Sequence, residues 1–353
     1  MQGTHYDPGK MKSRAIDIVD NVPLNATELA ALWNTYMQYS MFIRIFTYFS
    51  LTAEDNEIRP IMEDALDICH KRVNRVTEFF NNEKIPIPIA FSDNDVNLQA
   101  PRLFTDEYYL HYMINANKIA VGINGLSLIT SGRADVRDFY HHSINSSIHL
   151  YNNTINVMQS KGIYVRPPLI TTIRNVDYVK KQNFLGGFLG ERRSLLAQEI
   201  SALHSGVITN NVGKRLLMGF RQTVSTNQLR KFMDRGIDMA NNYIDIFSLS
   251  LTQEDVPDPI PWDFMVTDST TPIFSDKLMM FHTTMITSAG ILNYSASMAT
   301  SPRHDLMANY LKALVEVANY LEDGTNIMID NGWYEEPPRT VDRRELVNTE
   351  MKH

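Results

Sequence analysis

The motif PIPI at residues 86–89 returns as PDPI at residues 257–260, an offset of 171 residues. A second motif, GIY at residues 162–164 followed by PP at 167–168, returns as GWY at 332–334 followed by PP at 337–338, an offset of 170. A nearly constant offset over so long a span is the mark of an internal duplication. The chain is therefore expected to contain the same structural unit twice.

The apolar residues of each copy follow the period of an α-helix. Steps of three and four dominate the first copy, and the matching segment repeats them, which places one face of a long helix against a core. Alternation typical of strands is absent at any useful length, so the sequence predicts an all-α protein. The positions are Ile58, Ile61, Met62, Ala65, Ile68, Cys69, Val73, Val76 and Phe80, and then Leu229, Phe232, Met233, Gly236, Ile237, Ala240, Ile244, Phe247 and Leu251.

Four helices are predicted in the first copy, near residues 26–49, 54–82, 105–131 and 131–162. Thr52 is the expected N-cap of the second helix, and Gly162 the expected C-cap of the fourth. In the second copy, Ser301 followed by Pro302 predicts an N-cap with proline at the first helical position.

One connection in each copy is much longer than the others, over residues 84–103 and 255–273. Such a segment can carry the chain along the full length of a bundle, so that the second and third helices run parallel. The predicted fold is all-α, with two tandem ferritin-like four-helix bundles and a long crossover between helices two and three of each.

The domain boundaries follow from the same repeat. We expect an N-terminal tail at residues 1–24, a first bundle at 25–168 and a linker at 169–194. A second bundle at 195–338 and a C-terminal tail at 339–353 complete the chain. The glycines of the linker, NFLGGFLG at 183–190, do not form a dinucleotide fingerprint, and a packed turn is expected there, with a phosphate loop as a remote alternative.

Composition excludes several classes of function. The net charge of −7 opposes binding to nucleic acid or to an anionic membrane, both of which need concentrated Lys and Arg. The single cysteine, Cys69, excludes an intrachain disulfide framework. No signal peptide is recognisable, and no stretch approaches the roughly 18 apolar residues of a membrane span. A cytoplasmic location is therefore expected.

Acidic and histidine side chains in the first copy resemble the ligands of a dimetal bundle, where Glu-x-x-His motifs point inward. At about 100° per residue, however, Asp67 points roughly 180° away from the apolar stripe of its helix, and His70 roughly 100° away. Glu107 and Asp138 also oppose their stripes. The candidates, which are Asp67, His70, Glu107, His111, Asp138 and His141, correspond in the second copy to residues such as Asn241, Lys277, Phe281 and Ala308. Exposed helix faces are the favoured interpretation.

Other motifs also have structural interpretations. Asp93-x-Asp95-x-Asn97 opens like a calcium loop, but residues 98 and 104 lack the required Gly and Glu, so turn and capping roles are expected. The pattern Ser-x-Arg-x-Asp at 131–135 and again at 301–305 predicts helix capping and compensation of the helix dipole. The histidines at 141, 142 and 149 are expected at the surface.

Several segments resemble one family along nearly the whole chain. They are EIRPI at 57–61, IPIP at 85–88, DVNLQAPRLF at 95–104, VTDST at 266–270, FSDKLMMFH at 274–282 and EDGTNIMI at 322–329. These segments resemble a family of uncharacterised proteins from endospore-forming Gram-positive bacteria. Its members resemble tandem ferritin-like bundles, and its single-bundle relatives are labelled as spore coat proteins of the coat F type. The resemblance implies no catalytic residue, but it suggests an association with spores.

The favoured function is that of a non-enzymatic structural or interaction protein, cytoplasmic or spore-associated. Protein partners or self-association are expected, with no nucleic acid and no membrane span, and a small-molecule ligand is left open. Tyr140 and His142 are suggested as exposed contact residues. No catalytic, cofactor-binding or metal-ligating residue is assigned, and no cofactor is expected. Two alternatives stay open: a ferritin-like metal-binding protein or oxidoreductase with iron or manganese in the first bundle, and a carrier of an apolar ligand in a bundle core.

Overall fold

The computed structural model of the chain describes residues 22–170, 175–176, 178–188, 192–259, 265–341 and 343. Most of the predicted N-terminal tail, much of the C-terminal tail and parts of the linker lie outside these residues, as does Ile260 of the second repeat motif. The tail and linker boundaries therefore stay predictions.

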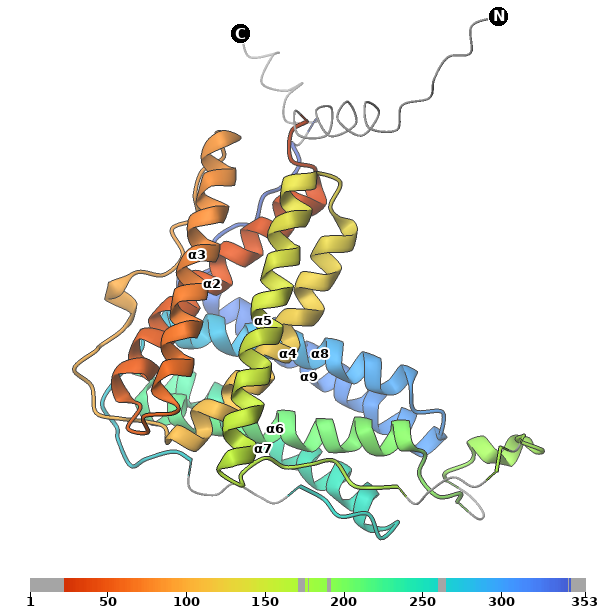
Figure 1. Cartoon of the computed structure of the whole chain (residues 1–353). Helices are drawn as coiled ribbons and strands as arrows, with labels where there is room; N and C mark the ends of the chain where they lie inside the picture. Colours follow the sequence, from red (N-terminus) through yellow and green to blue (C-terminus); the bar gives the residue numbers. More distant parts are fainter. Residues whose placement is uncertain are drawn as a thin grey trace, which may run out of the picture.

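Two four-helix bundles follow one another along the chain (Figure 1). The first bundle contains α2 (Ala26–Thr52), α3 (Arg59–Asn82), α4 (Asp106–Thr130) and α5 (Ala134–Ser160). The second contains α6 (Ala197–Thr223), α7 (Asn227–Thr252), α8 (Asp276–Ala299) and α9 (His304–Asp330), and the short 3₁₀ helices η1 (Asp93–Asp95) and η2 (Gln182–Leu185) lie in connections. The predicted all-α fold with two bundles is confirmed.

Contacts at the helix ends establish the direction of the helices in the first bundle. Asp106, at the start of α4, accepts a hydrogen bond of 2.9 Å from the backbone N–H of Asp55, just before α3. Arg133, after the end of α4, forms an ion pair with Glu83 at the end of α3. Because both starts and both ends meet, α3 and α4 run parallel, as the long crossover predicts.

The second bundle repeats this arrangement. Asp276, at the start of α8, accepts a hydrogen bond of 3.1 Å from the backbone N–H of Ser225, before α7. Arg303, after α8, lies 2.9 Å from a carboxylate oxygen of Glu254, after α7. One long crossover between two hairpins is the connectivity of ferritin-like bundles.

Two predicted N-caps are misplaced, because the N-cap of α3 is Ile58 instead of Thr52 and that of α9 is Arg303 instead of Ser301. Thr52 is the last residue of α2, where its hydroxyl donates to the carbonyl of Tyr48 at 2.8 Å, and α3 begins only at Arg59. Ser301 is fully buried three residues before α9, whose N-cap is Arg303. In both places a tight turn precedes the helix, so a Ser or Thr that resembles an N-cap instead ends the preceding element.

The Ser-x-Arg-x-Asp motif joins helix ends instead of supplying a serine cap. Glu28, at the start of α2, accepts hydrogen bonds of 2.8 Å from the backbone N–H groups of Gly132 and Arg133. The guanidinium of Arg133 pairs in turn with Glu83 and with Asp135. Three connections at one end of the bundle are thereby fixed to each other. The second copy uses Glu199, Arg303, Glu254 and Asp305 in the same roles.

The two crossovers pair with each other in antiparallel direction. Isolated bridges join Val96 to Phe274 and Phe104 to Val266. Val96 and Val266 are equivalent residues of the two copies, as are Phe104 and Phe274, since each pair is 170 apart. An interface in which i meets j and j meets i is the pattern of two-fold symmetry. The two bundles are therefore related by an approximate two-fold axis between the crossovers.

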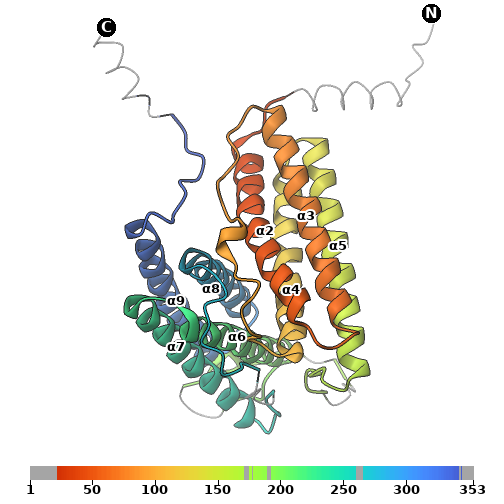
Figure 2. The ribbon, with the colours of Figure 1, turned by 90° about the vertical axis from the view of Figure 1, so that its left-hand side faces the viewer.

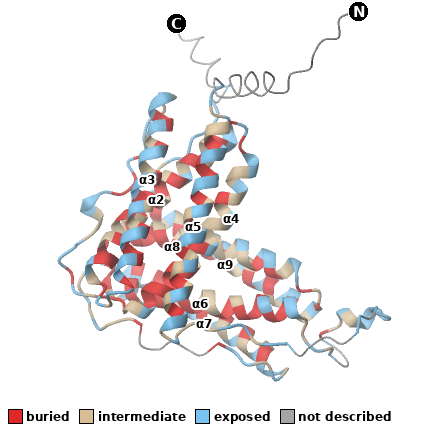
Figure 3. Ribbon diagram, in the orientation of Figure 1, coloured by how far each residue is buried: buried red, intermediate tan, exposed pale blue. Residues whose placement is uncertain are grey.

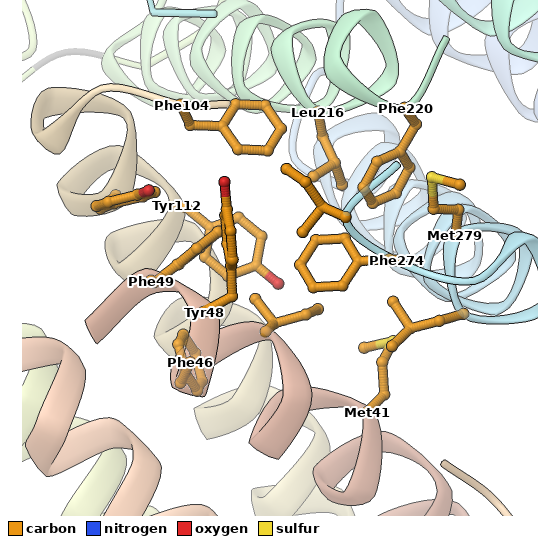
Figure 4. Packing of buried hydrophobic residues seen from close by; sticks show 14 of the residues in the cluster. Met41, Phe46, Tyr48, Phe49, Phe104, Tyr112, Leu216, Phe220, Phe274 and Met279 are labelled. Carbon is orange, nitrogen blue, oxygen red and sulfur yellow. The ribbon is translucent and has the colours of Figure 1, made fainter. Parts of the chain in front are cut away.

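The main core is shared by the two bundles. Figures 1 and 2 show the first bundle standing across the second, with α2 and α4 reaching α6 and α8 at the crossing point. Buried residues gather there (Figure 3). Side chains from both copies point toward one another (Figure 4), including Phe49, Phe104, Phe220, Phe274 and Met279. One continuous apolar cluster thus spans both halves, and the two bundles form a single packed unit.

Candidate functional site

The acidic metal candidates lie on the outside of the first bundle. Asp67, Glu107 and Asp138 are exposed, as their helical positions predict, and so is His70. Asp67 lies 2.5 Å from the ammonium of Lys71, one turn along the same helix, in a pair that is exposed on both sides. These groups are separated on three helices and do not converge.

His111 is the exception among those candidates, because its side chain is buried on α4. Burial disfavours the imidazolium form and lowers the pKa of His111 to about 4. A neutral imidazole in an apolar core is the result. The expected exposure of His111 is therefore wrong, because Glu107, one turn earlier on the same side of α4, is exposed while His111 is covered by the protein.

The histidines of α5 lie at the surface, as predicted. His141, His142 and His149 are exposed. His142 Nδ1 lies 2.7 Å from the backbone carbonyl of Asp138, and His149 Nε2 lies 3.0 Å from the amide of Asn153. Across the part of the chain that the structure describes, no group of three His, Cys, Asp or Glu side chains could hold a metal ion.

The calcium-like motif is a short turn, as expected. Asp95 accepts a hydrogen bond of 2.8 Å from the backbone N–H of Ser92, which completes a capping box around η1. It also accepts one of 2.7 Å from the hydroxyl of Ser275, at the start of α8 in the other copy. Asp93 forms an ion pair with Arg44. The acidic groups are therefore used to hold the crossover.

Tyr140 is not a surface residue, contrary to the suggestion from sequence. Its side chain is fully buried, and its hydroxyl lies 3.2 Å from that of Thr35 on α2. The ring continues the apolar stripe of α5 that includes Val136 and Phe139. Of the two suggested contact residues, only His142 is exposed.

A stripe of exposed apolar side chains runs along α9. We call it the α9 stripe and define it by Met307, Leu311 and Val315, which are 41%, 56% and 56% exposed. Steps of four residues place these side chains on one face of the helix. Aliphatic groups in such a row are an uncommon arrangement on a surface that has no partner.

The first copy carries polar residues at the same three positions. Arg137, His141 and Asn145 of α5 are exposed and precede the α9 residues by 170. The difference is therefore confined to one bundle, although the fold of the two is alike. Alignment of the two repeats at an offset of 170 residues shows this replacement of polar by aliphatic residues in the sequence itself.

A cleft of about 1020 Å³ lies between the bundles and continues into the second bundle. Its walls come from α2 and α4 of the first copy and from α6 to α9 of the second, and most of its lining is apolar. Sequence reasoning did not find it, since it depends on how the bundles cross. A signal was present in α4 and α8, which are apolar around much of their circumference and expose Leu126 and Leu292.

No helix in the described ranges is both long enough and apolar enough to cross a membrane.

Comparison with protein families gives a match over both halves of the chain. A family described as "Protein of unknown function (DUF3231)" matches residues 16–176 and again residues 183–346. The chain belongs to this family. The two DUF3231 matches coincide with the two bundles, so the resemblance to an uncharacterised family of tandem repeats is confirmed.

Two further comparisons complete this result. A search of curated proteins finds no match. Among solved structures, the chain is similar to a protein of Bacillus halodurans described as a "putative spore coat protein", with 16% identity and a TM-score of 0.39. The similarity covers 43% of this chain and 98% of that one.

Proposed function

We propose that this protein is a non-enzymatic assembly protein that associates with a second copy of itself through the α9 stripe. The observation that supports this is the exposure of Met307, Leu311 and Val315 in one row, at positions where the first bundle is polar. Burying such side chains between two proteins is favourable by roughly 25 cal/mol for each Å² of apolar surface.

Beyond the two ends of the α9 stripe, the same face of the helix carries polar residues that can pair as hydrogen-bond donor and acceptor. His304 and Glu322 are both exposed, and they lie nine residues on either side of Ala313 along α9. When two α9 helices pack antiparallel about that midpoint, Leu311 faces Val315 of the second copy. His304 then faces Glu322 of the second copy at both ends. Such self-complementarity is what a two-fold interface requires, and it favours a second copy over an unrelated protein.

The test is the mass of the protein in solution as a function of concentration, measured by sedimentation equilibrium. We expect a reversible dimer for the wild type and a monomer for Leu311→Asp, because a carboxylate in the centre of the stripe would lose its hydration on association. Leu51→Asp is the matched control, since Leu51 is similarly exposed, at 60%, on the end of α2. A wild-type chain that is monomeric throughout, or an unchanged dimer of Leu311→Asp, would contradict the proposal.

The location of the assembly is part of the same proposal. The family resemblance suggests the spore-forming cell, where a protein that acts through contacts with itself suits a layered structure. A fluorescent fusion followed through sporulation tests this. Accumulation around the developing spore is expected, and an even cytoplasmic signal through growth and sporulation would argue against it.

A further inference from the structure

The cleft between the bundles is apolar along most of its walls. Phe42 of α2, Ile119 of α4, Leu216 of α6 and Met285 of α8 are among its lining side chains. Its volume of about 1020 Å³ is at the upper end of the range for small-molecule sites, roughly 300 to 1000 Å³. A mostly apolar hollow of this size suits a hydrocarbon ligand.

Three glycines in the middle of helices keep the cleft wide. Gly122, Gly213 and Gly290 line it, and a Cβ atom added to any of them would meet no neighbouring atom within 4 Å. A glycine inside a helix destabilises it by about 1 kcal/mol relative to alanine. Close packing explains other glycines, such as Gly206 against Phe247, but it does not explain these three. Without side chains, these three glycines leave open space along the walls of the cleft.

Lys118 is the single charged side chain among the lining residues that the structure describes. It lies on α4, and none of the ion pairs found between described residues includes it. The residue is exposed to solvent, which places its ammonium at an open side of the cleft. Partial desolvation by the neighbouring protein lowers the pKa of Lys118. The charge of Lys118 also reaches α6, because it adds to the effect of burial in lowering the pKa of His204.

Hydrogen bonds hold the walls together beside Lys118. The hydroxyl of Thr209 on α6 lies 3.4 Å from the amide oxygen of Asn115, three residues before Lys118 on α4. The hydroxyl of Tyr294 on α8 donates to the amide oxygen of Asn210 at 2.9 Å. Side-chain hydrogen bonds thus join three helices from both bundles along the walls of the cleft.

From this arrangement we propose that the cleft binds a long-chain fatty acid, with its carboxylate on Lys118 and its hydrocarbon chain between the bundles. One cation with no acidic neighbour in the lining matches a head group with one negative charge. Phosphate groups are usually held by several donors or cations, which the lining does not provide. The site is separate from the α9 stripe and does not depend on self-association.

The first experiment compares charged and neutral forms of one probe on the full chain. Binding of the fluorescent fatty acid parinaric acid is measured by titration beside that of its methyl ester. We expect the acid to bind more tightly to the wild type. Lys118→Met should weaken the acid roughly tenfold or more and leave the ester unchanged, since a charge-assisted contact is removed. Lys118→Arg should retain acid binding, and Lys71→Met, at an exposed lysine of α3, is the control.

A second experiment locates the hydrocarbon chain. Gly122→Leu fills the cleft, whereas Gly125→Leu, on the same helix, adds the same side chain at a position that is also open but does not line the cleft. Thermal unfolding shows that both variants fold. The proposal requires weaker binding of the acid and the ester by Gly122→Leu alone. Absence of acid binding by the wild type, equal affinity for acid and ester, or equal effects of the two leucines would overturn it.

Discussion

The hydroxyl of Tyr112 lies 3.0 Å from Nε2 of His282, its own counterpart in the second copy. Both residues are buried, and Phe42 and Phe220 pack their rings against the imidazole. Equivalent residues can meet only on or near a two-fold axis. This contact therefore marks the axis that the paired crossovers define. The position on the axis is tyrosine in the first copy and histidine in the second.

Acid should destabilise the protein through His282. Complete burial lowers the pKa of His282 from 6.5 to about 3. Between these values the unfolded chain binds a proton that the folded chain does not, so stability falls as the pH falls. The slope from this residue is up to about 1.4 kcal/mol per pH unit. Chemical denaturation between pH 7 and pH 4 should show a steady loss, to which His111 contributes in the same direction.

Replacement of His282 separates its contribution to the pH dependence of stability from general acid denaturation. His282→Phe should lower stability at pH 7 by about 1 kcal/mol, because Tyr112 loses its hydrogen bond, yet flatten the dependence on pH. His142→Gln, at an exposed site, should leave the profile unchanged. Equal slopes for wild type and His282→Phe would show that the histidine is not kept neutral by the fold.

The buried arginine between the helix ends should be essential for stability. Arg303 is 1% exposed and bonds to Glu254, Asp305 and the carbonyl of Arg193. Arg303→Met leaves two carboxylates without their cation, and we expect a loss of roughly 3 kcal/mol in the free energy of unfolding. Arg221→Met removes an exposed pair with Asp234 and should cost less than about 1 kcal/mol. Urea denaturation of both variants provides the comparison, and similar losses would refute the role given to burial.

Two glycines of α6 should respond to alanine in opposite ways. Gly219 lies against the other copy, where an added Cβ would come within 2.5 Å of the ring of Phe104. Gly219→Ala should destabilise the protein by about 1 to 3 kcal/mol through overpacking. Gly213→Ala meets open space and should stabilise α6 by up to about 1 kcal/mol. Thermal melting decides the signs, and stabilisation by Gly219→Ala would mean that the bundles are not packed closely there.

The exposed acid once considered as a metal ligand should be dispensable. Asp67→Ala removes only the exposed pair with Lys71, so the free energy of unfolding should change by less than about 0.5 kcal/mol. Elemental analysis of wild type and variant, purified without an affinity tag, accompanies the unfolding measurement. Stoichiometric iron or manganese that disappears with Asp67, together with stability, would restore the metal-binding alternative.

The sequence predicts the local and repeated features of this fold well. Helical periodicity predicts the four helices of the first copy, and the repeat transfers them to the second. The long segments after Asn82 and Thr252 predict parallel middle helices. Errors came from turns, where Thr52 and Ser301 resemble caps but end the preceding element. Tyr140 is a different kind of error, because its spacing from Val136 already places it on the buried stripe of α5 and only its residue type suggested a surface contact.

Features that join the two halves could not be predicted in this way. The bridge from Phe104 to Val266 and the contact of Tyr112 with His282 link residues more than a hundred positions apart. Periodicity describes one helix at a time and contains no information on how two bundles cross. The cleft depends on that crossing, which brings Lys118 and the three glycines of its lining together only in the folded chain.

The reciprocal pairing of the crossovers has an evolutionary consequence. Two separate chains with one bundle each would form this same symmetric contact, and their association would depend on concentration. Carrying both copies on one chain makes the encounter intramolecular. It also allows one half to mutate without its twin. Histidine could then replace tyrosine on one side of the axis only, and an aliphatic row could arise on α9 while α5 stayed polar. One chain with two copies of the unit therefore keeps the symmetric contact while its halves are free to specialise.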